Sequence, residues 1–205
     1  KNKKIDILIN NNNNSLNYYY PIPKDHILSL IIPTKDNVSL LEKCINSLLN
    51  NPPGCKVEIL LINNNSQEKS TYNYFNSLSA IRNQDVNLSV IDYPKKFNYS
   101  AINNFAVKQT NAAIIGLINN DVEVINSDWL REMVSHAYRE DVGCVGAKLY
   151  FENDTIQHAG VITGLGGVAG HSHKFYKRNM YGYAERLCAC QQLSAVTAAC
   201  LLVKR

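Results

Sequence analysis

The sequence contains no long hydrophobic run. No apolar stretch among its 205 residues reaches the roughly 18 to 20 residues that a membrane-spanning helix requires. Residues 1–14 carry charge, but they lack the apolar stretch of about 7 to 15 residues that marks a secretory signal. These two absences predict a cytoplasmic protein without a transmembrane segment.

Charged residues are scarce and evenly spread. They make up 19% of the chain, and the 21 basic and 17 acidic residues leave a formal net charge of +4. No basic stripe with interleaved aromatic residues is present, which argues against a nucleic-acid partner and favours a single small anionic ligand. The 45% hydrophobic content predicts a globular core rather than a disordered chain.

The cysteine pattern argues against a disulfide framework or a zinc site. Six cysteines are present, mostly within apolar runs, and none has Cys-x-x-Cys spacing. Cys188 and Cys190 form the one close pair. Because no third ligand lies nearby in the sequence, we expect two ordinary reduced thiols there, with a metal or redox site as the weaker alternative.

The first 26 residues have the composition of a linker or tail, with asparagine at 10–14 and prolines at 21 and 23. Beyond His26 the pattern alternates between buried strands and amphipathic helices. Strands are predicted at 27–32, 57–62, 88–91 and 113–118, and helices at 38–49, 70–81, 99–109 and 129–137. Ser39 and Glu42 have capping-box spacing, and Asn98 can cap the third helix.

Shorter strands with glycine-rich turns are predicted at 142–151, 155–162 and 194–203. The fold class is therefore α/β, with a Rossmann-like, mostly parallel sheet flanked by helices and a smaller second β region. We expect one half at 27–140 and the start of another at 141–205.

Chemistry in such a sheet is expected where the parallel strands end. Asp121 directly follows a buried strand and is the leading candidate for a divalent metal ligand, with Glu123 two residues later. Asn119 and Asn120 offer only neutral oxygens, so the metal would be held weakly without substrate phosphates. A simple turn explains the same spacing about as well.

Other polar positions allow two interpretations. The Asn63 side-chain amide can bind a pyrimidine ring, although the asparagine and serine residues at 63–66 favour a turn. His158, His171 and His173 lack further zinc ligands, so loop histidines that face solvent or substrate are expected. Residues 164–169 fit the dinucleotide motif G-x-G-x-x-G/A, but they come late and open no amphipathic helix, which argues against an oxidoreductase.

A series of segments resembles the family 2 glycosyltransferases, particularly the bacterial branch for O-antigen and rhamnan-type polysaccharides. The resemblance covers residues 27–205 and rests on 31–36, 97–104, 117–124, 156–160, 164–171 and 194–203. It implies a GT-A fold that binds a nucleotide-diphosphate sugar with a divalent metal, Mn or Mg. It also implies a hexosyltransferase that transfers the sugar, with inversion, to a glycan or lipid-linked glycan at the inner membrane face, where the chain is peripheral.

The resemblance also assigns roles to individual residues. Those matching the family's nucleotide-sugar contacts are Pro33, Thr34, Asp36, Asn63, Asn104, Asn120 and Asp121. Asp121 is the metal-binding member of the Asp-x-Asp position, and His158 and His171 lie on the acceptor side. Asparagine stands at Asn63 and Asn119 where the family usually has an acidic residue.

The family's catalytic base is a carboxylate in an acidic motif that follows the segment matching 197–203 by a few tens of residues. We therefore expect the base beyond Arg205, in a C-terminally truncated chain that binds donor but is inactive alone. The base would take the proton of the acceptor hydroxyl, and the metal would neutralise the departing diphosphate. The alternatives are a non-catalytic carbohydrate-binding or scaffold module with a degenerate donor site, and a nucleotidyltransferase.

Overall fold

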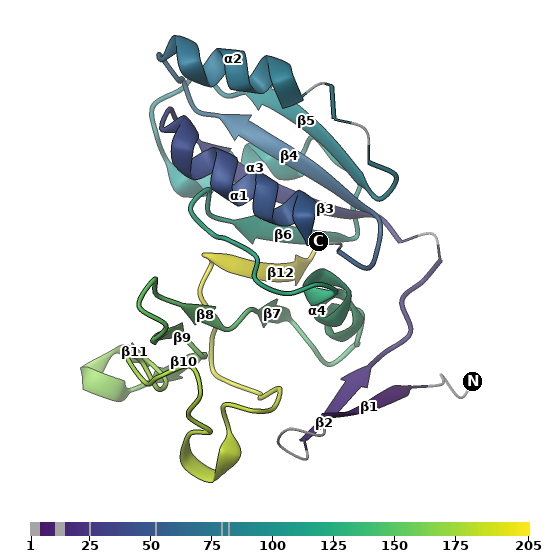
Figure 1. Cartoon of the computed structure of the whole chain (residues 1–205), viewed down its shortest axis with the longest axis vertical. Coiled ribbons are helices and arrows are strands. Elements are labelled where there is room, and N and C mark those ends of the chain that lie inside the picture. The colour runs from purple at the N-terminus through teal and green to yellow at the C-terminus, as the bar shows by residue number, and fades with distance from the viewer. Residues whose placement is uncertain (1–4, 11–14, 25, 52, 79, 82) are drawn as a thin grey trace.

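The computed structural model describes residues 5–10, 15–24, 26–51, 53–78, 80–81 and 83–205. Its centre is a six-stranded sheet in the order β5-β4-β3-β6-β12-β7 (Figure 1). These strands are β3 (Leu28–Thr34), β4 (Val57–Asn63), β5 (Val86–Asp92), β6 (Ile114–Ile118), β7 (Cys144–Gly146) and β12 (Cys200–Lys204). The first four along the chain are parallel, and β12 is antiparallel to both β6 and β7. The predicted mostly parallel α/β sheet is therefore confirmed.

Helices cover both faces of this sheet (Figure 1). They are α1 (Val38–Asn50), α2 (Lys69–Leu78), α3 (Tyr99–Val107) and α4 (Trp129–Ala137). Successive strand residues point to opposite faces, so Leu30 packs with α1 and α4 while Ile31 packs with Ile102 of α3. Both faces of β3 are fully buried, which explains its continuous apolar sequence.

Helix starts only partly follow the sequence prediction. Asn98 caps α3 as expected, because its side chain accepts a hydrogen bond from the Ala101 amide at 2.9 Å. The predicted capping box at Ser39 and Glu42 is wrong. The N-cap of α1 is Asn37 in a left-handed conformation, with φ of 53° and no side-chain capping bond.

The remaining strands form three small antiparallel pairs. At the N-terminus, β1 (Asp6–Asn10) pairs with β2 (Ser15–Tyr19), which is structure that the linker-like composition of residues 1–26 did not predict. Further along, β8 (Leu149–Tyr150) pairs with β9 (Ile156–His158), and β10 (Val161–Thr163) pairs with β11 (Ala169–His171). Two short 3-10 turns, η1 (Leu165–Gly167) and η2 (Tyr183–Glu185), complete this region.

The glycine-rich segment with the dinucleotide spacing is the turn between β10 and β11. Gly164, Gly166 and Gly167 all have positive φ, and the segment opens no α-helix. Its conformation therefore agrees with the rejection of a dinucleotide site. In the described part of the chain, no helix has both the length and the apolar character needed to cross a bilayer.

Candidate active site

A cavity of about 430 Å³ lies at the carboxyl ends of β3 and β6. Its lining consists of Pro33, Phe97, Tyr99, Asn119, Asn120 and 197–199. Ligands of parallel α/β sheets bind outside the carboxyl ends of the strands, so this is the expected place for a site. The fold thus brings together segments that the sequence analysis selected separately. We call this space the donor cavity.

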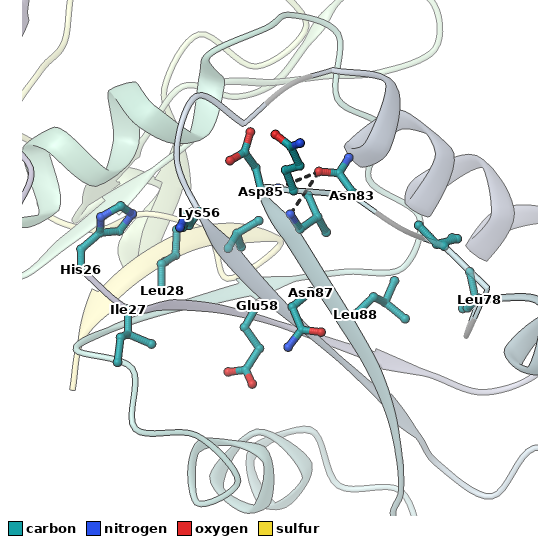
Figure 2. Close-up of a pocket in the computed structure, with 14 residues that line it drawn as sticks. His26, Ile27, Leu28, Lys56, Glu58, Leu78, Asn83, Asp85, Asn87 and Leu88 are labelled. Atoms are coloured by element: carbon teal, nitrogen blue, oxygen red, sulfur yellow. Dashed lines mark hydrogen bonds between the residues drawn. The ribbon is translucent and has the colours of Figure 1, made fainter. Parts of the chain in front are cut away.

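A second cavity, of about 490 Å³, lies at the opposite end of the sheet. Figure 2 shows it between the first residues of β3, β4 and β5, with Glu58 and Asn87 among the side chains around it. The Glu58 carboxylate accepts a hydrogen bond from the Ser29 hydroxyl at 2.5 Å and another from Thr110 at 2.9 Å. Since its carboxylate is engaged within the protein and the cavity lies at the amino ends of the strands, we assign it no ligand.

Hydrogen bonds connect the loop after β6 to the segments around the donor cavity. The Asn119 amide donates to the Ala199 carbonyl at 3.0 Å, and the Asn120 side-chain amide donates to the Thr34 hydroxyl at 3.1 Å. Tyr99, at the start of α3, donates its hydroxyl proton to the Ala198 carbonyl at 3.3 Å. These bonds fix the segments at the ends of β3 and β6 and the segment before β12 against one another.

Asp121 follows this fixed loop and is exposed, as is Glu123. Burial, with a contribution from both carboxylates, raises the pKa of the Cys44 thiol to about 12. The Cys44 thiol of α1 is 3.8 Å from the Asn119 carbonyl oxygen, so this helix contacts the start of the same loop. Asp121 and Glu123 are two residues apart in that loop.

The residues around Asp121 fit a divalent ion for which the protein supplies only some of the ligands. In the described chain Asp121 belongs to no cluster of three or more histidine, cysteine or acidic side chains. Mg²⁺ sites commonly use one or two carboxylates together with substrate phosphates. An exposed carboxylate with a second one nearby matches that pattern, and a diphosphate would complete the coordination.

Asp36, predicted to touch the nucleoside, has a structural role at the start of α2. Its Oδ1 accepts hydrogen bonds from the backbone amides of Gln67 at 2.8 Å and Glu68 at 2.9 Å. The bond from Glu68, followed by that from Gln67, holds the pKa of the Asp36 carboxyl below its usual value. These bonds attach the loop after β3 to the start of α2, and Asp36 itself has φ of 49°, a conformation that bulky residues disfavour.

Asn63 is 2% exposed, and its side chain is engaged within the protein. It donates to the Asp92 carboxylate at 2.7 Å and accepts from the Ser66 amide at 3.1 Å, which is the turn that its composition favoured. Asp92, at the end of β5, is exposed beside it. The predicted contact between Asn63 and a nucleobase stays a prediction, and Asp92 becomes a further candidate at the same edge.

We expect Asn63→Ala to weaken nucleotide-sugar binding by about 1 to 2 kcal/mol, because the variant leaves Asp92 and the Ser66 amide without a partner. The measurement is a calorimetric donor titration of both proteins. Asp92→Asn is the informative companion, since it keeps the shape of the pair and removes its charge. Unchanged affinity in Asn63→Ala would leave Asn63 with only its turn role.

The paired asparagines of α3 differ in their surroundings. Asn104, the predicted donor contact, is exposed. Asn103 is 6% exposed, and it donates to the Tyr99 carbonyl at 2.9 Å while its own carbonyl oxygen has no hydrogen-bond partner. Tyr99 lines the donor cavity, so Asn103 supports a cavity residue, and the sequence could not distinguish it from its neighbour.

His158 and His171 form a pair behind the wall of the donor cavity. Their Nδ1 atoms are 2.9 Å apart, and His158 Nε2 accepts the Thr197 amide proton at 3.3 Å. His158 therefore carries its own proton on Nδ1 and donates it to His171. Burial, with a smaller contribution from His171, lowers the pKa of His158 to about 4, so the ring is neutral at physiological pH.

His158 is 1% exposed, so the expectation that it faces solvent is wrong. The sequence could not show this, because its burial depends on β9, β11 and residues 194–199 coming together. The His158 ring positions Thr197, which lines the donor cavity. Direct contact of either histidine with an acceptor stays a prediction.

Among the described residues that line the donor cavity, none is acidic. Glu152, Asp154 and Glu185 are exposed elsewhere, and Asp154 pairs with Arg178 at 2.9 Å. The cavity therefore offers contacts for a donor but no carboxylate in place to deprotonate an acceptor hydroxyl.

Comparisons with known proteins point to one family. The model of the glycosyl transferase family 2 matches residues 29–205. The uncharacterized protein y4gI of Sinorhizobium fredii is 46% identical over 186 residues, which are 91% of this chain and 20% of that protein. The O-antigen biosynthesis protein RfbC of Myxococcus xanthus is 37% identical over 194 residues, which are 91% of this chain and 14% of that protein. The chain thus spans a fifth or less of the length of these relatives.

Solved structures show the same fold at low sequence identity. The mannosyltransferase PcManGT from Pyrobaculum calidifontis, in complex with GDP-Man and Mn²⁺, matches with a TM-score of 0.53 and 17% identity over 62% of this chain and 36% of that one. GalNAc-T7 with UDP, GalNAc and Mn²⁺ matches with a TM-score of 0.51 and 12% identity over 63% and 24% of the two chains. These likenesses confirm the expected GT-A fold.

Proposed function

Because this chain belongs to the glycosyl transferase family 2, we propose that it forms the donor-binding part of an enzyme that transfers a sugar, with inversion, from a nucleotide-diphosphate donor to a glycan or lipid-linked glycan acceptor. The single observation that carries the proposal is the donor cavity at the carboxyl ends of β3 and β6, with exposed Asp121 beyond its lining. The likeness to the O-antigen protein RfbC supports a role in bacterial surface polysaccharide synthesis.

In this proposal residues 27–140 hold the donor and residues 141–205 begin the acceptor side. Both parts contribute to the donor cavity, since Thr197 to Ala199 lie opposite Pro33 and Asn120 in its lining. The last strand, β12, also pairs with β6 inside the central sheet. Donor and acceptor sides therefore meet along a shared sheet rather than across a flexible linker.

Asp121, with Glu123 beside it, would hold a divalent ion such as Mn²⁺ or Mg²⁺. Such an ion, when bound, neutralises the charge that develops on a departing diphosphate. Asn120, held by Thr34, fixes the loop that presents the Asp121 carboxylate. Phe97 is 67% exposed and borders the cavity, so its ring is available to stack on a nucleobase.

Thermal unfolding in the presence of nucleotide-diphosphate sugars, with and without manganese, tests the proposal. A donor at 100 times its dissociation constant stabilises the folded state by about 2.7 kcal/mol. We expect stabilisation by at least one guanosine, uridine or thymidine diphosphate sugar, and only when manganese is present. Stabilisation by glycans alone, with none by any nucleotide sugar, would favour the non-catalytic carbohydrate-binding module.

A further inference from the structure

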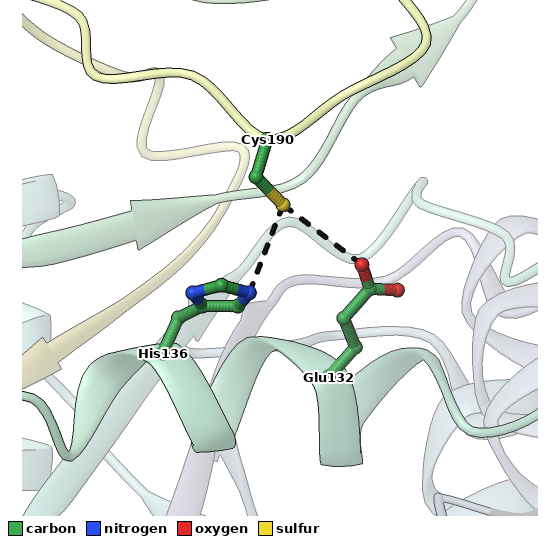
Figure 3. A group of neighbouring side chains, drawn as sticks. All are labelled: Glu132, His136 and Cys190. Carbon is green, nitrogen blue, oxygen red and sulfur yellow. Dashed lines mark hydrogen bonds between the residues drawn. The ribbon is translucent and has the colours of Figure 1, made fainter. Parts of the chain in front are cut away.

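Three side chains of metal-binding type meet at α4, and none of them lines the donor cavity. Glu132 and His136 are four residues apart, so they project from the same face of the helix (Figure 3). Cys190 reaches them from the segment after η2, with its Sγ 3.9 Å from Glu132 Oε1 and 3.7 Å from His136 Nε2. All three ligand atoms lie within 4.8 Å of one another.

We propose that Glu132, His136 and Cys190 bind one zinc ion. Zinc bonds to sulfur, nitrogen and oxygen are about 2.0 to 2.3 Å long, which places tetrahedral ligand atoms roughly 3.3 to 3.6 Å apart. The Cys190 Sγ separations of 3.9 Å from Glu132 and 3.7 Å from His136 are slightly larger, so binding would draw the ligand atoms together. Three protein ligands leave a fourth position for water.

The ligand types distinguish this site from the one at Asp121. Thiolate and imidazole select zinc over manganese or magnesium, whereas the carboxylates of Asp121 and Glu123 suit the harder ions. As the zinc–sulfur bond forms, the Cys190 thiol releases its proton to solvent. His136 Nε2 contributes its lone pair and keeps its proton on Nδ1.

Glu132 and His136 are half-buried, and Cys190 is exposed. The neighbouring Arg139 guanidinium is paired with Asp141 at 2.5 Å and lies over the Tyr20 ring. Arg139 is thus engaged with partners outside the three ligand side chains.

An ion here would attach separate segments of the chain to one another. Cys190 belongs to a loop closed by a hydrogen bond of 2.9 Å from Arg186 to Gln191, and Thr197 to Ala199 of the donor cavity follow within ten residues. On its other side, the His136 ring packs edge-on against Tyr20, directly after β2. The role of the zinc would be structural: it would hold the segment that leads to the cavity wall to α4.

Zinc titration of the metal-free protein against a competing chromophoric chelator tests the proposal. We expect one zinc per chain, and we expect C190S to bind it more than about 100-fold more weakly, since losing a ligand should cost at least as much as losing a ligand's supporting partner. C188S is the matched control, because it removes the other thiol of the pair and should bind zinc as tightly as the parent. Cobalt should give a thiolate charge-transfer band that C190S lacks and C188S retains.

Absence of zinc binding in the low micromolar range, or equal weakening by C188S and C190S, would overturn the proposal. E132Q, which nearly preserves side-chain size, should weaken zinc binding and keep the cobalt–thiolate band, so the site is testable even if C190S folds poorly. D121A should bind zinc normally. Loss of donor binding in D121A and loss of zinc binding in C190S are therefore independent results.

Discussion

Asp121→Ala is expected to abolish manganese-dependent binding of a nucleotide-diphosphate sugar, with an affinity loss of at least about 100-fold. The carboxylate is exposed in the loop after β6, so it is expected to take part in ligand binding rather than in packing of the core. The fold should therefore be retained. Removing a residue that only supports a metal ligand typically lowers metal affinity about 10 to 100-fold, and Asp121 is the proposed ligand itself. Calorimetric titration of donor with manganese measures the loss.

Glu140→Ala is the matched control, because it removes an equally exposed negative charge from another part of the surface. It should leave the dissociation constant unchanged. If the Glu123 carboxylate supports the same ion, the dissociation constant of Glu123→Ala should lie between those of Asp121→Ala and Glu140→Ala. Donor binding by Asp121→Ala at the affinity of the parent would show that the metal assignment is wrong.

The 205-residue chain is expected to bind donor without transferring its sugar. The donor cavity has no acidic residue in its lining, and a general base contributes about 10² to 10⁴ in rate. The acceptor hydroxyl would keep its proton, although the donor is held. The measurement is the single-turnover rate of sugar transfer from radiolabelled donor to an oligosaccharide acceptor, at donor concentrations that saturate binding.

Rapid transfer by this chain would contradict the expectation and would show that a carboxylate within these 205 residues, such as Glu152, Asp154 or Glu185, serves as the base. Each can then be replaced by its amide. The variant that loses transfer but retains donor affinity identifies the base, because the amide keeps the shape of the side chain and cannot accept the proton.

The sheet and its helices could be predicted because each has a local pattern. Buried strands such as Ile27–Ile32 and the amphipathic stripe at Trp129–Ala137 are visible in short windows, and the structure confirms them within a few residues. The meeting of strand ends was also predictable, since topology alone brings Pro33 and Asn120 to the lining of one cavity. These predictions required no knowledge of side-chain contacts.

What the sequence could not predict depends on partners distant along the chain. The bond between Asn63 and Asp92 could not be predicted, because the two residues are 29 positions apart. His158 looked like a loop histidine because Thr197, its partner, is 39 residues away. Cys190 had no third ligand nearby in the sequence, yet Glu132 lies 58 residues earlier and in contact with it in space. Side-chain roles of this kind are set by tertiary packing, which no local window contains.

The position of β12 has a consequence for the order in which this protein folds. The strand fits between β6 and β7, with Cys200 paired to Ile118 and Val203 to Cys144, so the sheet beyond β6 is completed by residues more than 80 positions later in the chain. During synthesis β3, β4 and β5 can pair early, while β6 would keep one unpaired edge until residues 200–204 leave the ribosome. Contacts this distant in sequence form slowly, and a strand with an unpaired edge is prone to aggregation during that wait. The rate of translation through residues 119–204 therefore sets how long the nascent sheet stays vulnerable.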